Sequence, residues 1–169
     1  MKKTLVIFAS SRSDGNTGKA LEAVIAGRNL EVINLREKNI SPYDYQNRNR
    51  EDDFLELAEK MTKSDVIIFA TPVYWYTMSA QLKTFFDRFT DLITIRKDLG
   101  RALKGKLCYV IATGADTALP PGFESPISAT CAYLDMIYKG SLYCYVRKDG
   151  SFGPGALEKA EEFGKEVFG

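Results

Sequence analysis

Five short apolar segments recur along the chain, separated by segments with helical spacing. We place strands at about residues 4–10, 30–35, 65–71, 106–112 and 141–146. The first, third and fourth are almost continuously apolar, which is typical of parallel strands covered on both faces. The second is more polar, which predicts a position nearer the edge of the sheet.

Helices are predicted in the intervals. Asn16 or Thr17 can act as the N-cap of the first helix, which stops at Gly27. Ser79 is the predicted N-cap of the third. The other helices are marked by apolar residues three or four positions apart: Phe54, Leu57, Ala58 and Met61; Met78, Leu82, Phe85, Phe86 and Phe89; Ile127, Cys131, Leu134 and Ile137; and, after Pro154, Leu157, Ala160 and Val167.

This alternation predicts one α/β domain over residues 1–169. The expected architecture is a flavodoxin-like three-layer α/β/α sandwich with a five-stranded parallel sheet in the order 2-1-3-4-5. Ligands of such folds bind beyond the carboxyl ends of the strands. We interpret two polar stretches, residues 39–51 and 94–105, as surface excursions over the edge of the site.

Charge and hydropathy exclude several classes of partner. Lys and Arg number 23 and Asp and Glu 22, for a formal net charge of +1, so no bulk field attracts nucleic acid. No apolar run is long enough for a membrane span. The polar residues 10–16 interrupt the first apolar stretch too early for a signal peptide, so we expect a cytoplasmic protein.

Cysteine and histidine usage narrows the chemistry. Cys108, Cys131 and Cys144 are far apart, and the chain has no histidine. This pattern offers no CxxC pair, no His-containing zinc site and too few thiolates for an ordinary iron–sulfur cluster. We therefore expect no metal, and any redox chemistry would require an organic cofactor.

The loop after the first strand gathers donors suited to a phosphate. Hydroxyl, amide and guanidinium groups precede a helix start, whose dipole and free N–H groups favour anions. The Walker A and GxGxxG patterns are both absent, and a capped polar turn is the alternative. The candidate phosphate-binding residues are Ser10, Ser11, Arg12, Asn16 and Thr17.

Two further strand-end loops favour a flat aromatic ligand. Pro72, Val73, Tyr74 and Trp75 follow the third strand, and Thr113 and Gly114 follow the fourth. Large aromatic faces can flank an isoalloxazine ring, and a ligand with a phosphate at one end and a planar ring at the other is FMN. The alternative is that these rings pack into the core or an oligomer interface. We interpret Asp87–Arg88 as a structural ion pair.

Residues 10–17 and 71–88 resemble the two signatures of the NAD(P)H-dependent FMN reductase family, which includes iron–sulfur flavoproteins. The resemblance implies FMN as cofactor, NADH or NADPH as electron donor, and a homodimer with the flavin near the interface. Residues 40–45 lack the cysteine motif of the iron–sulfur branch. We therefore expect an oxidoreductase without that cluster, which passes electrons to a small-molecule acceptor.

Two other functions fit the same pattern. A flavodoxin-type carrier would bind FMN without nicotinamide turnover, although such carriers usually have acidic surfaces. A flavin-free regulatory domain could use the same fold. The acceptor and the choice between NADH and NADPH stay open, and no catalytic side chain is assigned. A basic cluster could meet a 2′-phosphate or simply be a solvated surface: Arg96, Lys97, Arg101, Lys104 and Lys106.

Overall fold

The computed structural model describes residues 2–169 and contains one five-stranded parallel sheet. The strands are β1 (Thr4–Phe8), β2 (Glu31–Asn34), β3 (Val66–Pro72), β4 (Leu107–Gly114) and β5 (Ile137–Tyr145). Their order is β2-β1-β3-β4-β5, which confirms the predicted flavodoxin-like topology, with β2 at an edge. The register sets Val6 beside Val32 on one side and Ile68 on the other.

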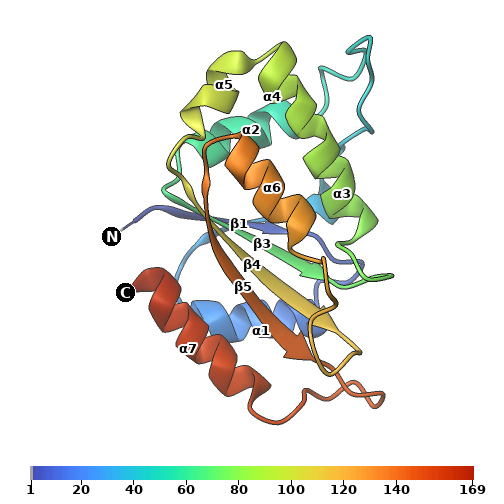
Figure 1. Ribbon diagram of the computed structural model, residues 1–169, viewed down its shortest axis with the longest axis vertical. Helices are drawn as coiled ribbons and strands as arrows, with labels where there is room; N and C mark the ends of the chain where they lie inside the picture. The colour runs from blue at the N-terminus through green and yellow to red at the C-terminus, as the bar shows by residue number, and fades with distance from the viewer. Residues whose placement is uncertain (1) are drawn as a thin grey trace.

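Helices cover both faces of the sheet (Figure 1). On one face lie α1 (Asn16–Ile25) and α7 (Ala156–Phe168). The other face carries α2 (Phe54–Thr62), α3 (Ala80–Asp87), α4 (Asp91–Thr94), α5 (Lys97–Ala102) and α6 (Ser125–Tyr133). Two 3-10 turns, η1 (Leu35–Glu37) and η2 (Arg88–Thr90), complete the chain. None of the helices between residues 2 and 169 combines the length and apolar character that crossing a membrane requires.

The alternation of side chains along each strand builds two separate cores. Leu5 and Ile7 of β1 point to the α2–α6 layer, whereas Val6 and Phe8 point to α1 and α7. Phenylalanine rings dominate the larger core, with Phe69 of β3 5.0 Å from Phe86 of α3 between ring centroids. Because the central strands are buried on both faces, their carboxyl ends are held at one rigid edge.

The last strand begins earlier than the sequence predicted. Helix α6 ends at Tyr133, and Ile137, predicted to be helical, instead pairs with Leu107 as the first residue of β5. Asp135 adopts a left-handed conformation, with φ +55°, that turns the chain out of the helix. The edge position explains the error, because Lys139 and Gly140 make the first half of β5 polar and unlike a buried strand.

The predicted ion pair between Asp87 and Arg88 is wrong. Adjacent helical residues point in different directions, and Asp87 pairs with Lys83 one turn earlier. Arg88 is fully buried, where its Nε donates to Asp91 Oδ2 at 2.9 Å and its guanidinium also pairs with Asp52. Arg88 Nη1 donates to the Ser41 carbonyl at 3.1 Å, so this side chain fixes the loop that precedes α2.

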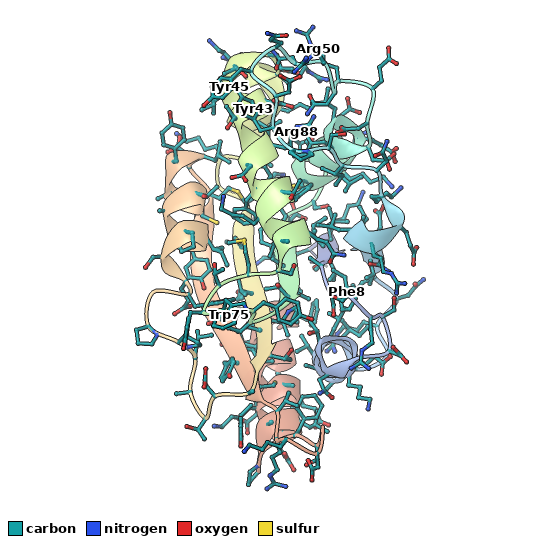
Figure 2. All side chains as sticks on the ribbon, turned by 90° about the vertical axis from the view of Figure 1, so that its right-hand side faces the viewer. Phe8, Tyr43, Tyr45, Arg50, Trp75 and Arg88 are labelled. Atoms are coloured by element: carbon teal, nitrogen blue, oxygen red, sulfur yellow. The ribbon has the colours of Figure 1, made fainter. Side chains whose placement is uncertain are left out.

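The two polar stretches do not cover the site edge. Figure 2 shows Tyr43, Tyr45 and Arg50 at the Arg88 end of the molecule, far along α3 from Trp75. Residues 94–105 include α5 and lead into the amino end of β4. Neither stretch lines the hollow described below. The prediction failed because polarity shows that a loop is exposed, but not at which edge of the sheet it lies.

Candidate active site at the carboxyl edge

A hollow of about 470 Å³ opens where four strands end. The loops after β1, β3, β4 and β5 contribute its lining: Ser10, Arg12, Gly15, Asn16, Thr17, Pro72, Val73, Tyr74, Thr113, Gly114, Ala115, Val146, Arg147 and Lys148. This volume lies within the range of about 300–1,000 Å³ that small-molecule sites occupy. A larger hollow of about 1030 Å³ lies at the opposite edge, away from the strand ends where ligands of this fold bind.

The start of α1 is free of any side-chain cap. The N-cap is Gly15, with φ −77° and ψ −178°, and no side chain among residues 2–169 caps the first turn. The predicted capping role of Asn16 or Thr17 is therefore wrong. The Thr17 hydroxyl instead forms a buried hydrogen bond of 2.7 Å with Thr113 Oγ1, which ties α1 to the end of β4. Uncapped amides at a helix start attract an anion.

Close packing shapes the loop in front of this helix. A Cβ on Gly18 would lie 2.2 Å from the Ser13 carbonyl oxygen, so the loop folds tightly against α1. At the end of β2, Asn34 Nδ2 donates a hydrogen bond of 3.1 Å to Ser13 Oγ. Arg12 is exposed and has no carboxylate within 4.0 Å in the described part of the chain. Arg12 is therefore available to bind an anion.

The loop after β3 is a tight hairpin turn that displays aromatic side chains. Tyr74 N donates to Thr77 O at 2.9 Å and Thr77 N to Tyr74 O at 3.2 Å. The two residues between them, Trp75 and Tyr76, have φ of +48° and +67°. Two central residues with positive φ form a type I′ turn, which normally favours Asn-Gly. Trp75 is 91% exposed (Figure 2), and Tyr74 and Tyr76 are exposed too, so none of the three rings packs into the core.

The end of β4, which lines the hollow, is closely packed by two side chains. A Cβ on Gly114 would lie 2.8 Å from the Tyr143 hydroxyl oxygen and 3.2 Å from Val73 Cβ. Tyr143 donates its hydroxyl proton to the Asp116 carbonyl at 2.7 Å. Burial raises the pKa of the Tyr143 phenol, which therefore stays neutral and keeps this bond. Glycine at position 114 therefore leaves room for the Tyr143 ring and for Val73, which pack against the end of β4.

Sequence reasoning missed the contribution of β5. Val146 pairs with Phe152, and Arg147 N donates to Ser151 O at 2.8 Å, so a short hairpin follows the strand. Arg147 and Lys148 of this hairpin line the hollow. The Asp149–Gly150 pair that turns the hairpin was the available signal.

The basic cluster considered from the sequence lies elsewhere. Lys97 and Arg101 belong to α5, which precedes the amino end of β4. Arg96 is held by Asp98 at 2.9 Å and by Glu59 at 3.6 Å. Hydrogen bonding to Asp98 raises the pKa of Arg96. These cations therefore lie at the opposite edge from the hollow.

The structure brings the predicted site residues together with two exceptions. Ser11 and Trp75 are outside the lining of the hollow, although Ser11 Oγ lies 3.4 Å from the Tyr74 hydroxyl at its rim. Their contact with a ligand stays a prediction. Within residues 2–169, no group of three or more His, Cys, Asp or Glu side chains is placed to hold a metal. Cys108, Cys131 and Cys144 are all buried.

Curated relatives share most of this chain. A Bacillus subtilis protein, YwqN, named as an NAD(P)H-dependent FMN-containing oxidoreductase, is 34% identical over 122 residues, which is 68% of this chain and 67% of the relative. An iron–sulfur flavoprotein of Methanocaldococcus jannaschii is 34% identical over 125 residues, 67% of this chain and 62% of its own. A third, from Archaeoglobus fulgidus, is 25% identical over 98% of this chain and 78% of its own.

Solved structures share the fold. The Trp repressor binding protein from Bacillus subtilis superposes with a TM-score of 0.78 at 28% identity, covering 95% of this chain and 97% of that one. An FMN-dependent NADH-azoreductase from Bacillus anthracis, solved in complex with FMN, has a TM-score of 0.73 over the full length of both chains at 12% identity. Residues 2–150 match the sequence pattern of NADPH-dependent FMN reductases, so the chain belongs to that family.

Proposed function

We propose that this protein binds FMN in the carboxyl-edge hollow, accepts hydride from NADH or NADPH, and passes electrons to a small-molecule acceptor. The observation that carries the proposal is the uncapped start of α1, which meets Arg12 at one end of a hollow whose other walls are the loops after β3, β4 and β5. A phosphate fits the first feature and the edge of a planar ring the second. Family membership supports the same cofactor.

The phosphate end is built mainly from backbone groups. The first residues of α1 and the buried Ser10 line this end of the hollow, and Arg12 adds a formal charge. Charge-assisted hydrogen bonds of this kind are about twice as strong as neutral ones. Thr17 and Thr113 share one hydrogen bond, so only one of their two protons is used between them. The other hydroxyl proton is free for a ligand oxygen.

The ring end would be held by the loops after β3 and β4. Val73 N already donates to the Thr113 carbonyl at 2.7 Å, which fixes the two loops relative to one another. Gly114, Ala115 and Tyr74 line this end of the hollow. FMN, when bound, supplies the hydride chemistry, and the protein contributes position, charge and exclusion of water. Hydride transfer through FMN requires no nucleophilic side chain from the protein.

We also infer a homodimer that works in the cytoplasm. An apolar groove between α3, α4 and α6 is lined by Phe86, Phe89, Ile93 and Tyr133, and Tyr133 is 73% exposed. Sedimentation equilibrium of the wild type should give twice the chain mass. Ile93→Glu should give the single-chain mass, because it places a charge in that groove. A monomeric wild type would contradict the dimer.

Anaerobic titration tests the enzymatic proposal. Protein loaded with FMN should be yellow, and its absorbance near 450 nm should bleach on addition of NADPH or NADH. Loaded protein that neither donor bleaches would indicate an electron carrier instead. Protein that takes up no FMN would indicate a flavin-free domain. Free FMN at the same concentration is the control for reduction without the protein.

A further inference from the structure

The hairpin after β5 gives the hollow a second cationic end. Gly150 N donates to Arg147 O at 2.9 Å, and Arg147 N donates to Ser151 O, so the turn is held by its own backbone. Asp149 directs its carboxylate into the same turn, where it accepts from the Ser151 amide at 2.9 Å and the Ser151 hydroxyl at 2.7 Å. Arg147 and Lys148 are left to line the hollow.

The lining of the hollow contains three cations and no carboxylate. Arg12, Arg147 and Lys148 are among its residues, and none of them has a carboxylate within 4.0 Å in residues 2–169. This excess is local, because the whole chain carries a formal charge of only +1. One phosphate monoester brings about −1.5 to −2. Arg12 and the helix start match most of that charge, so the β5 cations remain for a second anionic group.

The two cationic groups of the hollow come from different strands. Arg12 follows β1, whereas Arg147 and Lys148 follow β5, and the strand order places β3 and β4 between them. Three strand spacings separate the ends of β1 and β5 by about 14 Å. The start of α1 spans part of that interval, because Thr17 bonds to Thr113 at the end of β4. The charge balance, and not distance, therefore assigns the β5 hairpin to a second anionic group.

We propose that Arg147 and Lys148 bind the phosphate groups of the nicotinamide nucleotide and so determine donor specificity. This inference rests on the proposed function, which makes a nicotinamide dinucleotide the donor. Its phosphates are remote from the nicotinamide, so they can contact the β5 hairpin while the nicotinamide meets the ring loops. NADPH carries one more phosphate than NADH and should depend more strongly on these two cations.

A charge-matched pair of variants separates this role from a general field effect. Arg147→Gln/Lys148→Gln removes both hairpin cations. Lys97→Gln/Arg101→Gln removes two exposed cations from α5, at the opposite edge, that are likewise free of carboxylate partners within residues 2–169. Calorimetry on FMN-loaded protein should show that the hairpin variant binds NADP⁺ about tenfold, and NAD⁺ about threefold, more weakly than wild type does. The α5 variant should match wild type.

Two controls protect the assignment. Fluorescence titration of cofactor-free protein should give the same FMN affinity for the hairpin variant as for wild type, within about twofold. In the hairpin variant, the reduction of bound FMN measured by stopped flow should be slower than in wild type. The rate should fall most with NADPH, less with NADH, and not at all with reduced nicotinamide riboside, which has no phosphate. A riboside rate that falls equally would show that the cations act on the ring, and would overturn the inference.

The binding arm also distinguishes the two proposals. Equal NADP⁺ affinity in wild type and hairpin variant would refute the inference. An FMN affinity that falls as much as the NADP⁺ affinity would refute it too, because the cations would then serve the FMN phosphate. Wild type that binds NADP⁺ but is not reduced by any donor would refute the proposed function instead.

Discussion

Replacing Gly18 by Ala should selectively weaken binding of the phosphate end of FMN. Glycine to alanine inside a helix normally stabilises it by about 0.5–1 kcal/mol. Here the new Cβ would lie 2.2 Å from the Ser13 carbonyl oxygen, about 0.8 Å short of the 3.0 Å that real Cβ atoms respect. Because the contact is with backbone, the loop in front of α1 has to move.

The size of the effect follows from that displacement. An amide or hydroxyl about 2.9 Å from a phosphate oxygen that moves by about 0.8 Å no longer forms a hydrogen bond. A hydrogen bond to a charged group contributes about 1.5–3 kcal/mol. We therefore expect Gly18→Ala to lower FMN affinity about ten- to a hundredfold. Riboflavin lacks the phosphate, so its affinity should change by less than about threefold.

Fluorescence quenching with both flavins measures the two affinities. Gly164→Ala is the matched control, since its Cβ would lie 2.2 Å from the Val24 carbonyl at the other end of α1. That variant should lower the urea midpoint of unfolding without altering the ratio of FMN to riboflavin affinity. A Gly18→Ala protein that keeps the wild-type ratio would refute the assignment of this loop to the phosphate.

Four other predictions test the site and its support. Arg12→Ala should weaken FMN about ten- to a hundredfold and largely spare riboflavin, and equal losses for both would contradict its role. Arg88→Met should lower the free energy of unfolding in urea by about 3–5 kcal/mol, because two buried carboxylates lose their cation; Lys83→Met, at an exposed pair, should change it by less than about 1 kcal/mol. Burial raises the pKa of Cys144 to about 11, so this thiol stays protonated and should resist Ellman's reagent in the native protein at pH 9, whereas rapid labelling would contradict its burial. In a folded, FMN-loaded variant with all three cysteines replaced by alanine, nicotinamide-dependent FMN reduction should persist, and its loss would point to a thiol relay.

The central part of the fold was predictable because burial on both faces leaves a strong pattern. Residues 4–8 and 66–72 are almost wholly apolar, and the topology of such α/β chains follows from right-handed crossovers. The strand-end positions of residues 10–17 and 72–75 then fixed the candidate site. An edge strand such as β5 carries no such pattern, since Ile137 is 47% exposed and Gly140 interrupts the run.

The missed features depend on contacts between segments distant in sequence. Threonine is a residue type that commonly caps helices, but the Thr17 hydroxyl bonds to Thr113, which lies 96 positions later. Arg88 directly follows Asp87, which suggested a local ion pair, but its side chain is buried against Asp52, 36 positions earlier. Arg147 enters the site because the sheet order brings the end of β5 to the same edge as the other loops. Sequence spacing alone specifies none of these contacts.

In the turn Tyr74–Thr77, the residues that would give the highest melting temperature differ from the aromatic residues that the chain has. Its two central positions hold Trp75 and Tyr76 in left-handed conformations, each of which is unfavourable by about 1–3 kcal/mol for a bulky residue. Selection for heat resistance alone should therefore replace them by Asn-Gly, which the turn prefers. The resulting protein would melt at a higher temperature and would keep Tyr74 in the lining of the hollow, but it would lose two exposed aromatic rings beside that lining. If the Trp75 ring contacts the ligand, as the sequence predicts, attempts to raise the melting temperature should leave Trp75 unchanged.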